Sequence, residues 1–238
     1  MIACSCEVCI SADEKDKRYR SSLLVESNTT TIVIDTTPDF RSQMLRSQVM
    51  KLDAVLITHH HKDHIAGLDD IKAYNFFGGK AMRLYADEIT QEALKREFTY
   101  IFAEDKYPGI PDIGLYPINM EPFIIGDIPV IPIRVWHLNM PVLGFRFGNF
   151  TYITDANRIE QHEKNKIIGS DILVLNALRQ AKHISHFNLE QAIALSDELA
   201  IPQAYFTHIS HQLGKHSDIS RTLPNGRALA YDLQEITT

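Results

Sequence analysis

The sequence has little cysteine and contains no long hydrophobic run. Three cysteines in 238 residues do not suggest the disulfide framework of a small secreted protein. No apolar stretch approaches the roughly 20 residues that a membrane-spanning helix needs. The N-terminal stretch MIACSCEVC also lacks the basic segment and the apolar core of a secretory signal. These absences predict a cytoplasmic protein without a membrane partner.

Positive charge is also scarce. The 24 Lys and Arg residues are outnumbered by 30 Asp and Glu residues, which gives a net charge of −6 and an isoelectric point near 6.0. Proteins that bind nucleic acid usually present a basic face, so this balance argues against nucleic acid as a partner. It remains compatible with a small anionic substrate, because bound metal cations reverse the local electrostatic field.

Strand and helix patterns alternate along the chain, which predicts an α/β fold. No short repeat, low-complexity segment or linker interrupts the pattern. We therefore predict one domain over 1–238, although two half-domains of similar layout stay open. Strands are expected at 21–26 and 30–35, which form a hairpin, and at 53–58, 82–87 and 123–137. Two strand arms with a tight hairpin at Gly148-Asn149 are expected over 142–156, and further strands at 171–177, 204–210 and, at a sheet edge, 228–236. Helices are expected at 40–48, 65–77, 89–102, from about 158 and from 188, and a surface loop at 106–117.

All three cysteines fall in one short stretch. Cys4, Cys6 and Cys9 have the spacing C-x-C-x-x-C. Thiols so close together are typical ligands of a thiophilic metal, most often zinc. Zinc is tetrahedral, so the three cysteines would need a fourth donor from elsewhere in the chain. The sequence therefore predicts a zinc site near the N-terminus.

A histidine cluster, THHHKDHIAGLDD, begins at the end of an apolar run. Clustered imidazoles pack poorly when they are neutral and repel one another when they are charged. A metal ion is the obvious group to hold them together. His59 and His61 lie two residues apart, so in an extended segment both point the same way and can bind one ion.

The same cluster offers ligands for a second ion. Asp63 and His64 lie one turn beyond His61 and face a neighbouring point. His60 lies between the paired positions and should face away from both ions. The spacing H-x-H-x-D-H therefore predicts a site for two metal ions.

Other polar residues also close apolar strands. His137 follows IPIRVW, Asp155 follows FTYIT and His208 follows AYFT. Ligand sites in open α/β sheets gather outside the carboxyl ends of the strands. Each residue alone would usually be a structural histidine or a turn residue, but beside the histidine cluster they become candidate metal ligands. Asp35 ends the strand TIVI and could orient a ligand histidine without binding metal itself.

The motif H-x-H-x-D-H after an apolar strand, with a later His, Asp and His at strand ends, resembles the metallo-β-lactamase superfamily. The resemblance spans nearly the whole chain and implies a four-layer αβ/βα sandwich with a dinuclear metal site at one edge. A bridging aspartate in place of a cysteine is similar to the phosphodiesterase branches and not to the lactam hydrolases. The resemblance implies one metal on His59, His61 and His137, a second on Asp63, His64 and His208, and Asp155 between them.

Finer features resemble the phosphoribosyl cyclic phosphodiesterases of phosphonate breakdown. These are the C-x-C-x-x-C start, DKRYRSSLLVE, IDTTPDFRSQML and GFRFGNFTYITDAN. In that group the three cysteines and a late histidine hold a structural zinc, which implies His211 as the fourth ligand. Members of that group also have a histidine in a segment like KHISHFNLEQA, and this histidine contacts the phosphate or protonates the leaving group. We assign this role to His186, next to the helix start at Asn188, with His183 as its competitor.

One departure concerns the N-terminus. Members of that group begin with a strand and a glycine-rich turn before the cysteines, whereas this sequence places Met1 two residues before Ala3. We therefore expect the sheet to lack its first strand and the structural zinc site to be frayed.

The predicted metals suggest a mechanism. Two cations about 3.5–4 Å apart can share a bridging water and lower its pKa enough to give hydroxide near neutral pH. We predict a dinuclear metal-dependent phosphodiesterase that uses this metal-bridging hydroxide on a small phosphodiester, with a cyclic sugar phosphate as a candidate. His186 and Asp63 are its expected catalytic residues, and zinc and manganese both suit the ligands. Arg146, Arg179 and Lys182 are candidate phosphate contacts, although a solvated surface charge is the commoner role.

Two alternative functions stay open. A nuclease of the tRNA 3′-end-processing type has similar ligands, but this chain has no long basic, glycine-rich arm and is acidic overall. The other alternative is a non-hydrolytic zinc-binding accessory protein, and complete donors for both metals favour an enzyme over it. The sequence leaves open the exact phosphodiester, the native metal and whether the chain forms a homodimer.

Overall fold

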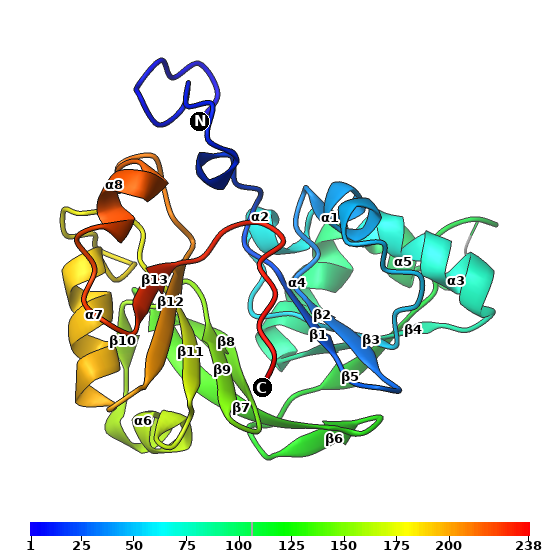
Figure 1. Cartoon of the computed structure of the whole chain (residues 1–238). Coiled ribbons are helices and arrows are strands. Elements are labelled where there is room, and N and C mark those ends of the chain that lie inside the picture. The colour runs from blue at the N-terminus through cyan, green and yellow to red at the C-terminus, as the bar shows by residue number, and fades with distance from the viewer. Residues whose placement is uncertain (106) are drawn as a thin grey trace. The chain divides into compact units, whose positions relative to one another are not determined.

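The computed structural model describes residues 1–105 and 107–238. The chain divides into two compact units, one of residues Arg20–Val130 and one of Met1–Tyr19 with Ile131–Thr238 (Figure 1). Each unit contains a β-sheet with helices packed on it and a hydrophobic core of its own. That these units form one domain stays a prediction. The predicted loop at 106–117 begins at residue 106, which lies outside the described residues.

The Arg20–Val130 unit contains a five-stranded sheet in the order β1-β2-β3-β4-β5. The first two strands form the predicted antiparallel hairpin, and each later strand runs parallel to its neighbour. The middle strand is completely buried, as its continuous apolar run predicts. The strands are β1 (Leu23–Glu26), β2 (Thr31–Ile34), β3 (Ala54–Leu56), β4 (Met82–Ala86) and β5 (Ile113–Pro117).

Strand β5 corrects the prediction of a loop over 106–117. Five of its residues pair in parallel with β4, from Ile113 opposite Met82 to Pro117 opposite Ala86. The glycine and proline content suggested a loop. However, β5 is an edge strand, and an edge strand tolerates proline because one side of its backbone needs no ladder hydrogen bonds.

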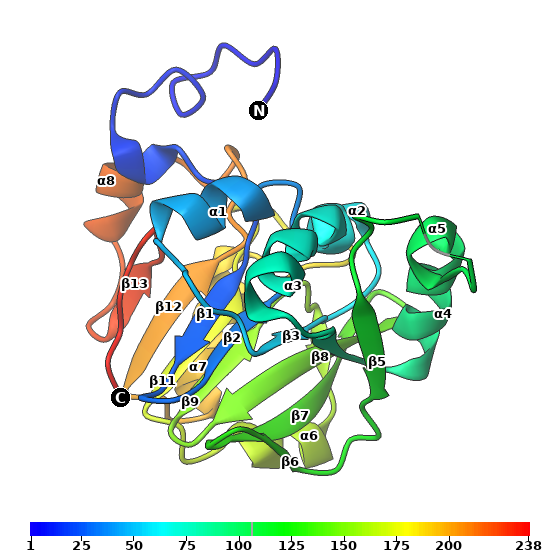
Figure 2. The ribbon, with the colours of Figure 1, turned by 90° about the vertical axis from the view of Figure 1, so that its right-hand side faces the viewer.

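Short helices cover this sheet. The core joins Val33, Val55 and Leu84 of the strands to Phe40 and Leu94 of the helices. Figure 2 shows α1 and α3 side by side on the sheet. The elements are α1 (Phe40–Arg46), α2 (Lys62–Ile65), the 3-10 helix η2 (Leu68–Ile71), α3 (Lys72–Gly78), α4 (Glu88–Glu97) and α5 (Thr99–Phe102).

Two helices that we predicted as continuous are broken. The one at 65–77 is interrupted at Gly67, whose N–H donates to the carbonyl of Thr36 over 2.9 Å. A Cβ at this position would lie 2.1 Å from the carbonyl oxygen of Thr37. The chain therefore passes too close to a neighbouring backbone for any other residue. The helix at 89–102 breaks at Phe98, which has φ −119° and ψ 49°.

The unit of Met1–Tyr19 and Ile131–Thr238 contains most of a larger sheet in the order β10-β7-β8-β9-β11-β12-β13. The short strand β6 and the start of β7 with which it pairs belong to the Arg20–Val130 unit. Strands β7, β8 and β9 alternate in direction, whereas β9, β11, β12 and β13 run parallel. The hairpin predicted at Gly148 is present, whereas the edge strand predicted over 228–236 is confined to Arg227–Leu229. The strands are β6 (Phe123–Ile125), β7 (Ile128–His137), β8 (Met140–Phe147), β9 (Phe150–Ile153), β10 (Arg158–Ile159), β11 (Ile172–Asn176), β12 (Gln203–Thr207) and β13 (Arg227–Leu229).

The helix predicted from about Arg158 begins later. Arg158 and Ile159 form β10, which pairs with Trp136 and Val135 of β7. The Arg158 guanidinium lies 4.9 Å from the centre of the Trp136 ring, and Ile159 is buried in the core. These tertiary contacts favour a short strand, and the helix α6 (Gln161–Ile167) follows it.

Helices α6 and α7 (Leu189–Glu198) lie along one face of the larger sheet (Figure 1). Helix α7 begins as predicted at Asn188, whose side chain accepts from the Gln191 N–H while the Gln191 side chain accepts from the Asn188 N–H. Leu189 and Leu195 pack into the core with the strands. Among the described helices, none has the length and apolar content to cross a membrane.

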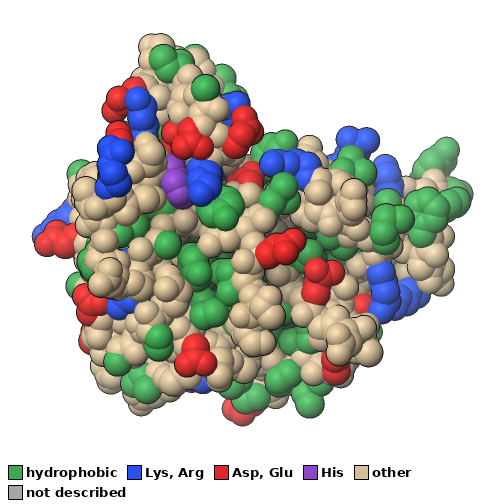
Figure 3. Space-filling view, viewed as in Figure 1, with side chains coloured by type: hydrophobic (Ala, Val, Ile, Leu, Met, Phe, Trp, Pro, Cys, Tyr) green, Lys and Arg blue, Asp and Glu red, His purple; other side chains and the backbone are tan. Residues whose placement is uncertain are grey.

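The N-terminal segment is attached to the end of the same unit. It contains the 3-10 helix η1 (Glu14–Asp16) and, within residues 1–22, no strand. Asp16 accepts from the His216 N–H over 2.7 Å, and the Arg18 guanidinium lies 2.9 Å from His216 Nδ1. His216 begins α8 (His216–Ser220). Acidic and basic side chains are interspersed over the N-terminal segment and α8 (Figure 3).

Replacement of Gly67 should test the break between α2 and η2. We expect Gly67→Ala to lower the free energy of unfolding by about 1–3 kcal/mol, because the new methyl group overlaps a fixed backbone carbonyl. Gly78→Ala is the control, since a Cβ at this helical position meets nothing nearer than the Lys80 side chain at 4.0 Å. Urea denaturation of both variants measures the difference. Equal stability of the two variants would show that the close approach at Gly67 is wrong.

Candidate functional site

The first polar cluster lies at the carboxyl end of β2 and β3, within the Arg20–Val130 unit. Asp35 follows β2, while Thr58 and His59 follow β3. The Asp35 carboxylate accepts from the Thr58 N–H over 2.8 Å, from the Thr58 hydroxyl over 2.9 Å and from His64 Nδ1 over 2.7 Å. All four residues are buried. The register of two parallel strands thus brings the predicted Asp35 to the histidine cluster.

These hydrogen bonds determine the tautomers of two histidines. His64 Nδ1 donates to Asp35, so the lone pair of this ring lies on Nε2. The Thr58 hydroxyl gives its hydrogen to Asp35 and therefore accepts from His59 Nδ1, 3.0 Å away. His59 then also carries its lone pair on Nε2. Both rings are held in the form that binds a metal through Nε2.

Burial raises the pKa of the Asp35 carboxyl, and the interactions with His64 and Thr58 oppose this rise. A buried carboxylate is costly unless donors surround it. The hydrogen bonds from Thr58 and His64 meet that requirement, because they favour the ionised form. Asp35 is therefore built into the fold as an acceptor that orients imidazoles.

The remaining residues of the motif lie around the same point. The His59 ring centre is 4.7 Å from that of His61 and 4.2 Å from that of His64. His61 is the residue before α2, and Asp63 lies in the first turn of α2 with Oδ2 3.6 Å from His64 Nε2. The unit thus brings together the motif residues that we predicted as metal ligands.

The second polar cluster lies in the other unit, at the carboxyl ends of β7, β9 and β12. These strands run in the same direction, so their ends share one edge of the sheet. His137 ends β7, Asp155 lies just beyond β9 and His208 directly follows β12. His208 Nε2 lies 2.8 Å from Asp155 Oδ1. Three residues far apart in the sequence therefore lie at this edge of the sheet, and their role as metal ligands stays a prediction.

His186 belongs to the same cluster. Its Nε2 lies 3.2 Å from Asp155 Oδ1, and its ring centre lies 4.5 Å from that of His137 and 5.0 Å from that of His208. His183 lies on the other side of His186, with the two Nδ1 atoms 3.2 Å apart. Of the two candidates in this segment, His186 is the one that contacts Asp155.

Three site residues have a left-handed backbone. Asp35, Asp155 and His208 have φ values of 67°, 51° and 53°. Residues other than glycine rarely adopt this conformation, although Asp and His do so more often than most. Each of the three turns the chain sharply at a strand end. Such strain often accompanies a functional site, where it holds a side chain in place.

The third group is formed by the cysteines and His211. Ligand atoms of Cys4, Cys6, Cys9 and His211 all lie within 4.8 Å of one another, and Cys4 Sγ and Cys6 Sγ are each 3.4 Å from His211 Nδ1. Zinc–ligand bonds of roughly 2.0–2.3 Å place tetrahedral ligands roughly 3.3–3.8 Å apart, so the donors suit zinc. The backbone N–H of Cys9 and the ring of His211 lower the pKa of Cys6 to about 6. This favours the thiolate that binds metal. The predicted fourth ligand is therefore beside the thiols.

Sequence reasoning missed three residues that position these clusters. The Thr58 hydroxyl donates to Asp35 and accepts from His59, and the Ser185 carbonyl accepts from His137 Nδ1 over 2.9 Å. Asn176, at the end of β11, accepts from the Ala156 N–H and donates to its carbonyl. A buried polar residue at the end of an apolar strand was the available signal for Thr58 and Asn176. A backbone carbonyl such as that of Ser185 leaves no signal in the sequence.

Two of the three candidate phosphate contacts, Arg146 and Arg179, have structural partners. Arg146 donates to the carbonyls of Gly148, Lys166 and Ile168. Arg179 donates to the carbonyls of Ala181 and Lys182 and to the side chain of Gln212. Both guanidiniums therefore tie loops together, which agrees with the commoner role for such residues.

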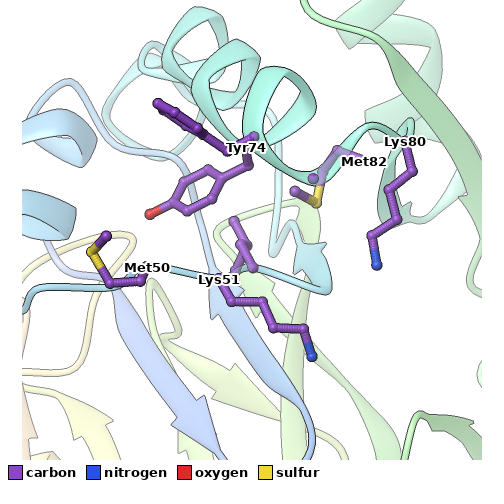
Figure 4. Close-up of a pocket in the computed structure, with 8 residues that line it drawn as sticks. Met50, Lys51, Tyr74, Lys80 and Met82 are labelled. Atoms are coloured by element: carbon purple, nitrogen blue, oxygen red, sulfur yellow. The ribbon is translucent and has the colours of Figure 1, made fainter.

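A pocket of about 290 Å³ lies away from the histidine cluster. Met50, Lys51 and Leu52 line it and precede β3, whereas His59 follows that strand, so the two features lie at opposite ends of it. Figure 4 shows Lys51 and Lys80 extending toward the same side. Both ammonium groups pair with Asp53. The pocket takes no part in the candidate metal site.

Comparison with known proteins identifies relatives over the whole chain. The family model described as a beta-lactamase superfamily domain matches residues 30–209. The crystal structure of a diphosphatase from the PhnP family is 39% identical, with a TM-score of 0.91 over 98% of this chain and 89% of that one. The short form of human tRNase Z is 17% identical, with a TM-score of 0.67 over 92% and 95% of the two chains. These matches confirm the predicted superfamily and fold class.

A curated relative is larger than this chain. The octanoyltransferase of Porphyromonas gingivalis is 35% identical over 97% of this chain, but the match covers 47% of that protein. The chain therefore spans about half the length of this relative. The likeness extends over nearly every residue of this chain.

Replacement of Asp35 should test its role in orienting His59 and His64. We expect Asp35→Asn to weaken zinc binding at the histidine cluster about 10- to 100-fold, because the amide offers one acceptor to several donors. Asp53→Asn is the control: this carboxylate accepts from the Thr31 N–H and from Lys51 just before β3. Competition with a chromophoric chelator measures the affinity. Equal zinc affinity of the two variants would contradict the assignment.

Proposed function

Since the chain belongs to the β-lactamase superfamily, as the family model over residues 30–209 shows, we propose that it is a metal-dependent phosphodiesterase acting on a small phosphodiester. The observation that carries this proposal is the complete set of His and Asp donors at strand ends. The donors of one unit lie around Asp35, and those of the other unit lie around Asp155.

The donor chemistry suits two divalent cations. Imidazole and carboxylate ligands suit zinc and manganese, and the rings of His59, His64 and His137 each direct Nδ1 to an acceptor and carry the lone pair on Nε2. Following the pattern of the superfamily, we assign the first cation to His59, His61 and His137. We assign the second to Asp63, His64 and His208, with Asp155 shared by both.

When bound, two such cations supply Lewis acidity, which lowers the pKa of a water molecule and offsets charge on the phosphate. The chain's own contribution is to hold the ligands and to deliver a proton. His186 Nε2, on the edge of the ring that faces Asp155, donates to the leaving oxygen as the P–O bond breaks. Asp63, in the first turn of α2, would be one of the residues that hold the second cation, and that cation would supply charge to bind the phosphate.

A small phosphodiester is the substrate class that the chain supports best. The likeness to a PhnP-family diphosphatase extends over 98% of the chain, which supports attack at phosphorus. The net charge of −6 gives no support to binding of long nucleic acids. Within this class, a cyclic sugar phosphate is our specific proposal. A diphosphate, which is an anhydride and lies outside the class, is the second candidate because of the named activity of that relative.

A substrate panel tests this function. We expect the protein loaded with zinc or manganese to hydrolyse a five-membered cyclic ribose phosphate faster than an acyclic dialkyl phosphodiester or a nucleoside diphosphate, and not to cleave a tRNA precursor. Treatment with a chelator should abolish turnover, and readdition of the metal should restore it. Phosphorus NMR identifies each product. If protein with both cations bound cleaves neither phosphodiesters nor diphosphates, the proposed function is wrong.

The role of His186 can be tested separately from metal binding. We expect His186→Ala to lower kcat about 10²- to 10⁴-fold, because the leaving oxygen loses its proton donor. The metal content, measured by inductively coupled plasma mass spectrometry, should stay unchanged. His162→Ala is the control, since the His162 side chain on α6 is exposed. Loss of metal from the His186 variant would show that this residue is a ligand instead.

A further inference from the structure

His183 and Ser185 surround one nitrogen of His186. His183 Nδ1 lies 3.2 Å from His186 Nδ1, and Ser185 Oγ lies 3.1 Å from His186 Nδ1 and 3.3 Å from His183 Nδ1. The three residues belong to one turn between β11 and α7. Their contacts are on the edge of His186 opposite to Asp155, which faces Nε2. The ring of His186 is thus held between two partners.

The hydrogen positions in this turn follow from one backbone group. The Ser185 N–H donates to His183 Nδ1 over 3.3 Å, so that nitrogen is an acceptor and carries no hydrogen. A hydrogen on His186 Nδ1 points to the same acceptor, 3.2 Å away. Burial, with further effects of His186 and Arg179, lowers the pKa of His183, which agrees with a neutral ring. The arrangement therefore favours one hydrogen on His186 Nδ1 and leaves Nε2 to carry the second hydrogen of the protonated ring.

We propose that His183 is a positioning residue: it accepts a hydrogen bond from His186 Nδ1 and thereby keeps Nε2 as the nitrogen that exchanges a proton with the substrate. This proposal rests on the role of His186 in the proposed function. His186 enters the step with a hydrogen on each ring nitrogen; as the bond between phosphorus and the leaving oxygen breaks, the Nε2 proton moves to that oxygen and the hydrogen on Nδ1 stays. His183 gains and loses no proton in this step.

The geometry also explains why an acceptor is needed at this place. Without a partner on Nδ1, the ring of His186 is free to rotate about its side-chain bonds or to change tautomer. Either change would carry the Nε2 hydrogen away from the reaction. A fixed partner removes these alternatives, and groups of this kind typically contribute 10- to 100-fold to activity.

Three variants test the proposal. We expect His183→Ala to lower kcat about 10- to 100-fold with KM changed less than twofold. His183→Asn should recover most of the activity, because its Oδ1 occupies nearly the position of Nδ1 and accepts the same hydrogen bond. The exposed His162→Ala serves again as the control. Metal content and thermal unfolding should match the wild type in all three.

The leaving group provides a second readout. His183→Ala should slow hydrolysis of an alkyl phosphodiester far more than that of a p-nitrophenyl phosphodiester, because nitrophenolate leaves without a proton. A merely structural effect would slow both substrates equally. Equal losses on the two substrates would therefore overturn the proposal.

A double-mutant cycle separates this proposal from the proposed function. In the His186→Ala background, the further change His183→Ala should have no effect on kcat. An additional loss of the same size as in the wild type would show that His183 acts on its own. A wild-type protein that is active, with a His183→Ala variant equal to the control, would overturn this proposal alone. An inactive wild-type protein with its metals bound would instead overturn the proposed function.

Discussion

The parallel alignment of strands is the constraint on which the rest of the structure depends. Strands β2 and β3 in one unit, and β7, β9 and β12 in the other, end at a common edge of their sheets. Residues that are far apart in the sequence become neighbours only because of this alignment. A residue that directly follows one of these strands then lies at this edge, where its side chain can act as a donor. Shifting the register of any one strand would remove its donor from the cluster.

Burial gives this arrangement a cost in free energy. His59, His64, Asp35 and Asp155 are all buried, and polar groups in such places are costly unless they are hydrogen-bonded. Asp35 meets this requirement by accepting from Thr58 and His64. The left-handed backbone of Asp35, Asp155 and His208 adds strain of roughly 1–3 kcal/mol each. The large cores of the two units stabilise the fold against this cost.

Most of the fold could be predicted from the sequence, because apolar runs and turn residues agree with the structure. The failures have physical causes outside the local pattern. Gly67 breaks a helix because another backbone lies against it, and β10 forms because Arg158 and Ile159 contact the larger sheet. The segment with β5 looked like a loop because an edge strand tolerates its proline and glycine.

The candidate site was predicted more completely than the residues that support it. His59, His61, Asp63 and His64 form a motif whose spacing has few other uses, and His137, Asp155 and His208 share a place at strand ends. The roles of Thr58, Ser185 and Asn176 depend on hydrogen bonds to Asp35, His137 and Ala156, which are distant from them in the sequence. Only the folded chain reveals such partners. The site of the cysteines and His211 was predictable only in part. The cysteine spacing indicated a zinc site, but only the family resemblance connected His211 to it.

Anomalous scattering from crystals grown with zinc would show whether the two sets of donors hold a pair of ions. Data collected on both sides of the zinc absorption edge locate each bound ion. We expect two neighbouring peaks, one within bonding distance of His59, His61 and His137 and the other of Asp63, His64 and His208, with Asp155 touching both. A third peak should lie among Cys4, Cys6, Cys9 and His211. Absence of the paired peaks, or ions that leave His137, Asp155 and His208 uncoordinated, would contradict the proposed pair of ions.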